Sequence, residues 1–270
     1  MKEDCVGFLQ WALPQMEMRW AGFRKVRNQV CKRIRRRLKV LNLQDFEEYK
    51  RWLTTHDSEW EVLDEMCRIT ISRFYRDWAV FDFLKGEILP LLAQQALLEK
   101  RPLRVWSTGC ASGEEPYTLS LIWNFVFKEK FPSLDFHIAA TDIDAQLLKR
   151  AKIGCYTPGS LKGLPKEWLD IAFVKKGNEY CIHSQYEKNI KWMQQDIRIA
   201  QPYGVFDLVL CRNLVATYFE TTLQIDIFNK IRSAMRSGAI LVLGCHEKLP
   251  TEVEGFSMKE EKLNIYVKDQ

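Results

Sequence analysis

The stretch from Leu103 to Leu121 constrains the fold of this 270-residue chain more than any other. It begins with a short apolar run, passes through a turn that contains Gly109 and Gly113, and opens a helical segment at Glu114. In an α/β protein, a glycine-containing turn between a strand and a helix is where a ligand approaches the backbone. The order strand, glycine turn, helix therefore predicts the edge of a parallel sheet that binds a small molecule.

The same alternation of strand and helix continues along the chain. Further apolar strands are predicted at Phe136–Ala140, Phe206–Leu210 and Ala239–Leu243, with helical segments between them. Strands that alternate with helices pair mostly in parallel and are covered by helices on both faces. We therefore expect an α/β domain at residues 91–270.

Two regions depart from that alternation. The first 90 residues show only helical periodicity, as in the apolar spacing from Phe23 to Leu41, which predicts a small all-helical domain at residues 1–90. Within residues 155–193, Tyr180–Ile182 and Ile190–Met193 are typical of short antiparallel strands. A small antiparallel β insertion is therefore expected at about 155–193.

The basic excess of the chain is confined to its N-terminal part. Residues 1–50 carry 12 basic and 6 acidic side chains, whereas the whole chain has a net charge of only +5. Nine basic residues lie between Arg24 and Lys39, on one predicted helix. Such a helix attracts either an acidic protein surface or the phosphates of RNA. A merely solvated helix face is the third interpretation.

Eight cysteines and four histidines are spread widely along the chain. There is no CxxC motif, and no two cysteines lie closer than 26 residues, a spacing unlike that of compact zinc motifs. No metal site is therefore expected. The sequence also has no apolar run of about 18 residues, and its start lacks the cleavage site of a secretory signal. These features predict free, buried thiols in a cytoplasmic protein without membrane insertion.

Acidic residues occupy the turn after the first predicted strand. The turn lacks the GxGxxG pattern of dinucleotide binders, and Glu114 and Glu115 stand where a phosphate binder needs hydrogen-bond donors. An acidic turn suits a cationic ligand, and S-adenosylmethionine carries both an ammonium and a sulfonium group. Asp142, at the end of the second strand, is placed to accept hydrogen bonds from ribose hydroxyls. These residues favour S-adenosylmethionine, the alternative being a surface glutamate pair without a ligand.

Several blocks of the sequence carry a resemblance to a known family. GCASGEEPYTLSL at Gly109–Leu121, ATDID at Ala140–Asp144 and FDLVLCRNLVATYF at Phe206–Phe219 closely resemble the CheR family of chemotaxis-receptor glutamate methyltransferases. The resemblance covers nearly the whole chain. Three further blocks agree in the same order, namely SRFYRD (Ser72–Asp77), RAKIGCY (Arg150–Tyr156) and LVLGCHEKLP (Leu241–Pro250).

The resemblance implies a Rossmann-like class I methyltransferase sheet. It also implies O-methylation of glutamate side chains, with S-adenosyl-L-methionine as cofactor and S-adenosyl-L-homocysteine as product. In the family, the basic N-terminal helix faces an acidic helical protein substrate such as the cytoplasmic domain of a chemoreceptor. The resemblance therefore implies that Arg33, Arg36 and Arg37 bind the substrate.

Individual site residues carry over through the matching blocks. Arg76 and Tyr218 are the implied catalytic residues, Arg76 as the cation that holds an anionic acceptor and Tyr218 as an orienting hydroxyl. Glu115 is expected to bind the amino group of the cofactor and Asp142 its ribose. The implied cofactor-binding set is Thr70, Ser72, Arg76, Gly109, Glu115, Asp142, Asp196, Ile197, Arg212 and Asn213, with Asp196 and Ile197 beside the adenine.

The sequence leaves three other functions open. These are a carboxyl methyltransferase that acts on a small molecule, an RNA methyltransferase that uses the basic helix, and a non-catalytic module that senses the cofactor. The chain departs from the family pattern at Thr70–Ser72, where the family has TNxT, and at Cys245–Glu247, where it has SEN or SES. These departures are compatible with a branch that methylates another carboxylate.

Overall fold

The computed structural model describes residues 4–270; the first three residues, on which part of the secretory-signal argument depends, lie outside it. The chain divides into two compact units. Residues up to Thr70 and the segment Leu214–Gln224 form the helical unit, while Ile71–Asn213 and Ile225–Gln270 form the α/β unit. The division after Thr70 differs from the expected one near residue 90, because Phe74 and the helices that follow it pack into the core of the sheet.

The helical unit is built around a small aromatic core. Phe8 and Tyr49 are fully buried, and their rings stack with centroids 5.4 Å apart. Asp4 and Asp45 accept backbone hydrogen bonds that cap the first and fourth helices, which satisfies N–H groups otherwise left without partners. The helices are α1 (Cys5–Gln15), α2 (Trp20–Phe23), α3 (Arg27–Val40), α4 (Phe46–Leu53), α5 (Ser58–Cys67) and α12 (Val215–Tyr218).

A seven-stranded sheet forms the centre of the α/β unit. Its strand order is β6-β2-β1-β7-β8-β10-β9. The first five strands pair in parallel, β10 pairs antiparallel with β8, and β9 pairs antiparallel with β10. The mostly parallel sheet predicted from the sequence is therefore confirmed. Its strands are β1 (Leu103–Thr108), β2 (Phe136–Asp142), β6 (Ile190–Gln194), β7 (Phe206–Cys211), β8 (Met235–Leu243), β9 (Phe256–Glu260) and β10 (Ile265–Lys268).

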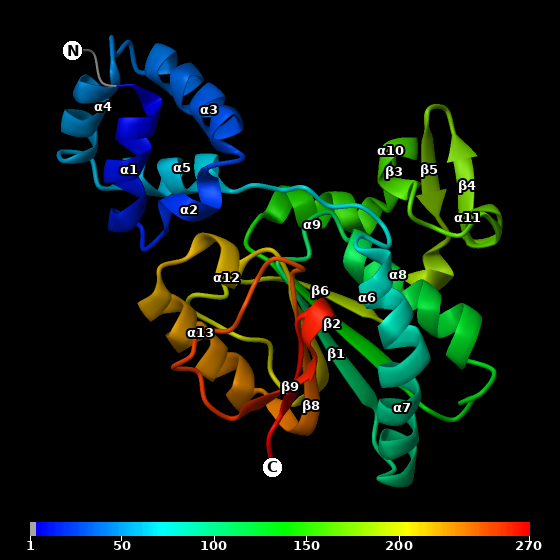
Figure 1. Ribbon diagram of the computed structural model, residues 1–270. Helices are drawn as coiled ribbons and strands as arrows, with labels where there is room; N and C mark the ends of the chain where they lie inside the picture. Colours follow the sequence, from blue (N-terminus) through cyan, green and yellow to red (C-terminus); the bar gives the residue numbers. More distant parts are fainter. Residues whose placement is uncertain (1–3) are drawn as a thin grey trace. The chain divides into compact units, whose positions relative to one another are not determined.

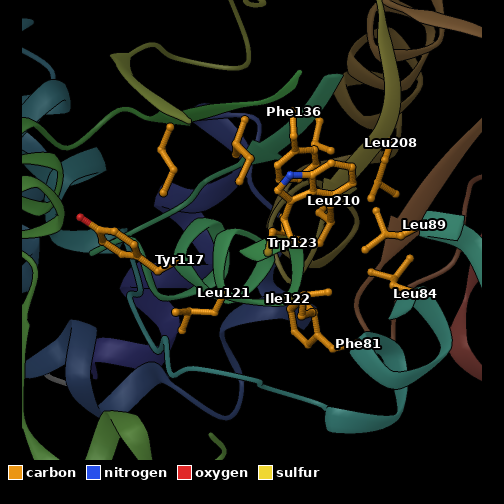
Figure 2. Packing of buried hydrophobic residues seen from close by; sticks show 14 of the residues in the cluster. Phe81, Leu84, Leu89, Tyr117, Leu121, Ile122, Trp123, Phe136, Leu208 and Leu210 are labelled. Carbon is orange, nitrogen blue, oxygen red and sulfur yellow. The ribbon is translucent and has the colours of Figure 1, made fainter. Parts of the chain in front are cut away.

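Helices cover both faces of this sheet, with α7 and α8 on one face and α13 on the other (Figure 1). Figure 2 shows how side chains from α8, from the helical stretch before it and from β2 and β7 fill the core. The rings of Trp123 and Phe136 stack there with centroids 4.4 Å apart. The helical elements are α6 (Trp78–Phe83), η1 (Leu84–Ile88), α7 (Leu89–Leu98), α8 (Glu114–Ile122), η2 (Trp123–Phe127), α9 (Ala145–Ile153) and α13 (Thr221–Ser233).

A separate three-stranded antiparallel sheet follows α9, as the sequence predicted. Its strand order is β3-β5-β4. The prediction was wrong about Ile190–Met193, because these residues belong to β6, which pairs in parallel with β2 and forms an edge of the main sheet. The insertion consists of β3 (Cys155–Tyr156), α10 (Pro158–Leu161), α11 (Lys166–Ala172), β4 (Phe173–Lys176) and β5 (Glu179–Ile182).

The expectation that all cysteines are free thiols was also wrong. Cys5 and Cys31 form a disulfide within the helical unit, and Cys155 and Cys181 form another in the β insertion. Each pair is 26 residues apart in sequence, and Cys155 faces Cys181 directly in the antiparallel register of β3 and β5. The fold therefore brings together sulfurs whose sequence spacing shows no motif. The four cysteines outside these two disulfides are Cys67, Cys110, Cys211 and Cys245.

Residues 4–270 contain no helix long and apolar enough to cross a membrane. Within the same range, no group of three or more histidine, cysteine, aspartate or glutamate side chains is arranged to hold a metal ion.

Candidate functional site

The turn between β1 and α8 adopts a backbone that depends on its small residues. Gly109, Ala111 and Gly113 all have positive φ angles, of 58°, 49° and 91°. A Cβ atom on Gly113 would lie 2.8 Å from the ring of Trp192, so glycine is required there for space as well as for conformation. The turn directs the Ala111 backbone N–H to the carboxylate of Asp142, at 2.8 Å. The sequence-predicted residues Gly109 and Asp142 thus lie in one site at the carboxyl ends of β1 and β2.

Arg212 links three parts of this edge of the sheet. It follows β7, which pairs with β1, and its Nη1 donates to Glu115 Oε2 at 3.0 Å. Its Nη2 donates to Asp77 Oδ2 at 2.7 Å and to the carbonyl of Arg76 at 3.1 Å. Glu115 also accepts a hydrogen bond from Ser107 Oγ at 2.7 Å. The fork of donors on the guanidinium therefore fixes the carboxylate of Glu115 relative to the loop that precedes α6.

Arg76 lies beside this ion-pair network. Its Nη2 donates to Asn213 Oδ1 at 3.3 Å, and its Nη1 donates to the carbonyl of Ile71 at 2.6 Å. The Nε of Arg76 is 3.8 Å from the carboxylate of Asp77. The structure thus brings together Arg76, Glu115, Arg212 and Asn213, four of the residues that the sequence singled out.

Asp77 belongs to this network although sequence reasoning did not select it. A signal was present, because Asp77 stands within the SRFYRD block next to Arg76. Its φ of +59° is uncommon for a residue other than glycine. A second missed residue is Glu247, whose carboxylate accepts the backbone N–H of Asn213 at 2.6 Å.

Three other expected cofactor contacts lie elsewhere in the α/β unit. Ser72 is half-buried and hydrogen-bonds the carboxylate of Glu114, and burial raises the pKa of that carboxyl above its ordinary value of 4.5. Asp196 forms an ion pair with Arg198 at 2.8 Å, and Ile197 is buried. The roles of Ser72, Asp196 and Ile197 at the cofactor stay predictions.

The remaining predicted residues belong to the helical unit. Thr70 is exposed, and the ring of Tyr218 packs on Phe23 with centroids 5.1 Å apart. Thr70 and Tyr218 therefore belong to the helical unit, whereas Glu115 and Asp142 belong to the α/β unit. Their predicted roles stay predictions.

The three arginines expected to bind the substrate differ in their surroundings. Arg33 donates to the carbonyls of Met66 and Arg68, and Arg37 forms a bidentate pair with Glu59. Arg36 is exposed on α3. Two of the three guanidinium groups thus contact their own unit, and Arg36 is the one that presents its charge to solvent.

Buried polar atoms at the carboxyl edge of the sheet fit a polar ligand such as S-adenosylmethionine. Among the described side chains, Thr108 Oγ1, Gln195 Oε1 and Arg212 Nε are buried and have no hydrogen-bond partner. Buried groups of this kind normally find partners in protein, water or ligand. Thr108 ends β1, and the backbone N–H of Gln195 donates to the carbonyl of Asp142. Both orphaned oxygens thus adjoin the residues expected to hold the ribose and the adenine.

The thiol of Cys110, in the turn, is buried. Burial, together with the nearby carboxylates of Asp142 and Glu115, raises the pKa of Cys110 well above its ordinary value of 9.0. The thiol is therefore protonated near neutral pH, whereas a cysteine nucleophile must be a thiolate.

The chain is similar to known proteins over most of its length. The family described as "CheR methyltransferase, SAM binding domain" matches residues 70–265. A chemotaxis protein methyltransferase of Listeria monocytogenes is 33% identical over 191 residues, which is 70% of each chain. A chemotaxis protein methyltransferase of Salmonella typhimurium is 26% identical over 90% of this chain and 84% of that protein. An uncharacterized 104.1 kDa protein of Rhodobacter capsulatus is 31% identical over 88% of this chain, which spans only 25% of that protein.

The matched residues include the whole turn after β1, Asp142, Arg212 and Glu247. The family model describes a domain that binds S-adenosylmethionine, and the orphaned polar atoms above fit that cofactor. The chain therefore belongs to the CheR family of methyltransferases, with S-adenosylmethionine as its cofactor.

Proposed function

We propose that this enzyme transfers the methyl group of S-adenosylmethionine to glutamate side chains of an acidic helical protein, such as the cytoplasmic domain of a chemoreceptor. The products are a glutamate methyl ester and S-adenosylhomocysteine. Relatives called chemotaxis protein methyltransferases align with 70% to 90% of the chain, which supports this substrate. One observation carries the proposal. The guanidinium of Arg76 adjoins the Arg212–Glu115 pair, and its positive charge suits an anionic acceptor.

The cofactor would be held by groups that are already fixed by the fold. Glu115 would receive its ammonium and Asp142 its ribose hydroxyls, with Asp196 and Ile197 at the adenine. When bound, the cofactor supplies an electrophilic methyl group. The buried Arg212 holds the carboxylate of Glu115 in one orientation, so that little ordering of this side chain is required when the ligand binds.

The acceptor needs no general base, because a side-chain carboxylate is already ionised near neutral pH. The work of the protein is to align the acceptor oxygen and exclude water. We assign Arg76 to bind the acceptor carboxylate, because its guanidinium offers the fork of donors that matches carboxylate geometry. Tyr218 would contribute an orienting hydroxyl.

The exposed face of α3 would attract the acidic substrate. Arg36 is exposed there together with Lys32, Arg35 and Lys39, so a cluster of positive charge faces solvent. Charges of this kind raise the rate of encounter with an oppositely charged partner. We propose a cytoplasmic location from such a partner alone, because the two disulfides remove the argument from free thiols.

A transfer assay tests the proposed function. Methyl-labelled S-adenosylmethionine is incubated with receptor fragments, acidic metabolites or RNA, and each product is then treated with alkali. We expect volatile labelled methanol from the protein fraction, since alkali hydrolyses carboxyl methyl esters. Base-stable label, or label confined to metabolites or RNA, contradicts the proposal. Cofactor binding without transfer to any acceptor supports a sensing module instead.

The Arg76→Ala variant tests the role of the guanidinium in the same assay. We expect transfer to fall by about 100-fold or more, as when one preorganised donor is removed from an active site. Binding of S-adenosylhomocysteine, measured by calorimetry, should change little. Loss of cofactor binding instead assigns Arg76 to the cofactor, and Arg150→Ala, at an exposed position of α9, serves as the matched control.

A further inference from the structure

Asn213 holds an uncommon backbone conformation directly after Arg212. Its φ is +55°, in the left-handed region that few residues other than glycine adopt. In this conformation its side-chain oxygen accepts the hydrogen bond from Arg76 Nη2. Such a conformation persists only where the surrounding structure stabilises it, and such residues cluster at functional sites. The contacts that hold Asn213 therefore bear on the orientation of Arg76.

The carboxylate of Glu247 is one such contact. Its Oε2 accepts the backbone N–H of Asn213 at 2.6 Å and that of Gly244 at 2.7 Å. Glu247 is only 4% exposed, and a buried carboxylate is costly unless its hydrogen bonds compensate. One carboxylate oxygen thus accepts two charge-assisted hydrogen bonds, which join the loop after β7 to the turn after β8.

The turn after β8 is shaped to admit this carboxylate. A Cβ atom on Gly244 would lie 2.7 Å from Glu247 Oε2 and 3.0 Å from Asn213 Oδ1. The carbonyl of Gly244 accepts a hydrogen bond from the buried Asn264 side chain at 3.1 Å, which fixes the turn from its other side. A side chain at 244 would therefore displace the carboxylate of Glu247 and crowd the side-chain oxygen of Asn213.

We infer that Glu247 is a positioning residue for methyl transfer, which holds Asn213 so that Asn213 orients the guanidinium of Arg76. This inference depends on the proposed function, because Arg76 must act on the acceptor. Glu247 would contact neither cofactor nor acceptor. Its removal should therefore lower the rate of transfer without weakening the binding of the cofactor.

The first test compares Glu247→Ala with Glu247→Gln. We expect Glu247→Ala to lower kcat/KM for the acceptor by about tenfold to a hundredfold, as displacement of a reacting group commonly does. Glu247→Gln keeps an oxygen acceptor and should recover most of the rate. The Kd for S-adenosylhomocysteine should stay within about twofold of the unchanged enzyme, since each tenfold in Kd would need a lost contact of about 1.4 kcal/mol. Equal rates for Glu247→Ala and the unchanged enzyme contradict the inference.

Gly244→Ala leaves the Glu247 side chain in the protein, but the added Cβ should push its carboxylate out of place. It should lower kcat/KM as Glu247→Ala does, while Gly86→Ala, where an added Cβ meets nothing within 4 Å, should not. Thermal melts of every variant identify those that fail to fold. If Glu247→Ala does not fold, an unchanged rate in Gly244→Ala contradicts the inference.

A double-mutant cycle separates this inference from the proposed function. If Glu247 acts through Arg76, then Glu247→Ala should cause no further loss in the Arg76→Ala background. If the two substitutions lower the rate by factors that multiply in the double variant, the inference about Glu247 is contradicted and the proposed function is not. Undiminished transfer by Arg76→Ala contradicts the proposed role of Arg76, and the inference with it.

Discussion

Arg212 Nη1 donates to the carboxylate of Glu115 at 3.0 Å, across 97 residues of sequence. The side chain of Arg212 is only 3% exposed, and its guanidinium lies over the ring of Phe81, 5.3 Å from the centroid. A buried arginine of this kind must keep its acidic partners, because an unpaired buried charge is strongly destabilising. The pair therefore links the stability of the α/β unit to the orientation of the residue expected to bind the ammonium group.

Arg212→Lys should weaken cofactor binding and destabilise the protein. A lysine ammonium is a point charge and cannot contact Glu115 and Asp77 with the geometry of the guanidinium fork. We expect the Kd for S-adenosylhomocysteine to rise roughly tenfold, with a loss of about 3 kcal/mol in the free energy of unfolding. Calorimetric titration and urea denaturation measure the two effects. Arg150→Lys on α9 is the control, and an unchanged Kd in Arg212→Lys contradicts the prediction.

Gly22→Ala should disturb the segment that carries Tyr218. An added Cβ on Gly22 would overlap the carbonyl oxygen of Thr217 and lie 3.2 Å from the Tyr218 ring. We expect a loss of about 1–3 kcal/mol in unfolding free energy, as for other overpacked sites, and a lower rate of transfer if Tyr218 is catalytic. Thermal melts and the transfer assay measure these changes. Gly86→Ala, which meets open space, should leave both unchanged; equal behaviour of the two variants contradicts the prediction.

The stability of the helical unit should depend on pH through Glu59. Burial alone would raise the pKa of this carboxyl, but hydrogen bonds from Arg37 and Tyr49 outweigh it and lower the pKa below its ordinary value of 4.5. A folded-state pKa below the unfolded one contributes stability above pH 4.5 that is lost as pH falls through the folded value.

Denaturation of the protein and of Glu59→Gln at several pH values below 7 tests this dependence. The variant should be less stable at pH 7 by about 1–3 kcal/mol, because it replaces a charged acceptor in a buried network. The difference should shrink as the pH falls below 4.5. Glu61→Gln, exposed on the same helix, should follow the unchanged protein. A difference that stays constant down to pH 3 or so contradicts the prediction.

The disulfides should stabilise the protein, and reductant should abolish this stabilisation. Cys155–Cys181 closes a segment of 26 residues, and in the chain-entropy account such a cross-link contributes roughly 3 kcal/mol. The double variant Cys155→Ser/Cys181→Ser should have a lower melting temperature than the unchanged protein. Reductant should lower the melting temperature of this variant further, but only by the contribution of the Cys5–Cys31 disulfide. Thiol titration of the unfolded protein should count four free thiols before reduction, and a count of eight contradicts the pairing.

Local pattern predicted well the elements that are expected to hold the cofactor. The order of β1, its glycine turn and α8 follows from apolar periodicity and from the backbone freedom that Gly109 and Gly113 provide. Periodicity does not report the direction in which a short strand pairs. Ile190–Met193 was therefore expected among the antiparallel strands of the insertion, although it lies in parallel beside β2. Strands β9 and β10 went unpredicted because each is only four or five residues long and β9 has no buried residue to give an apolar pattern.

The amino-acid pattern alone was enough to predict the α/β architecture and, through the ordered motif blocks, the family and its cofactor. Local interactions specify helices, strands and glycine turns, so that neighbouring residues suffice to predict them. The three-dimensional packing was needed to show that Arg212 pairs with Asp77, 135 residues earlier, that Glu247 supports Asn213, and that Cys155 meets Cys181. Hydrogen bonds and disulfides act over a few ångströms in space, and distance along the chain does not predict which residues the packed sheet brings that close.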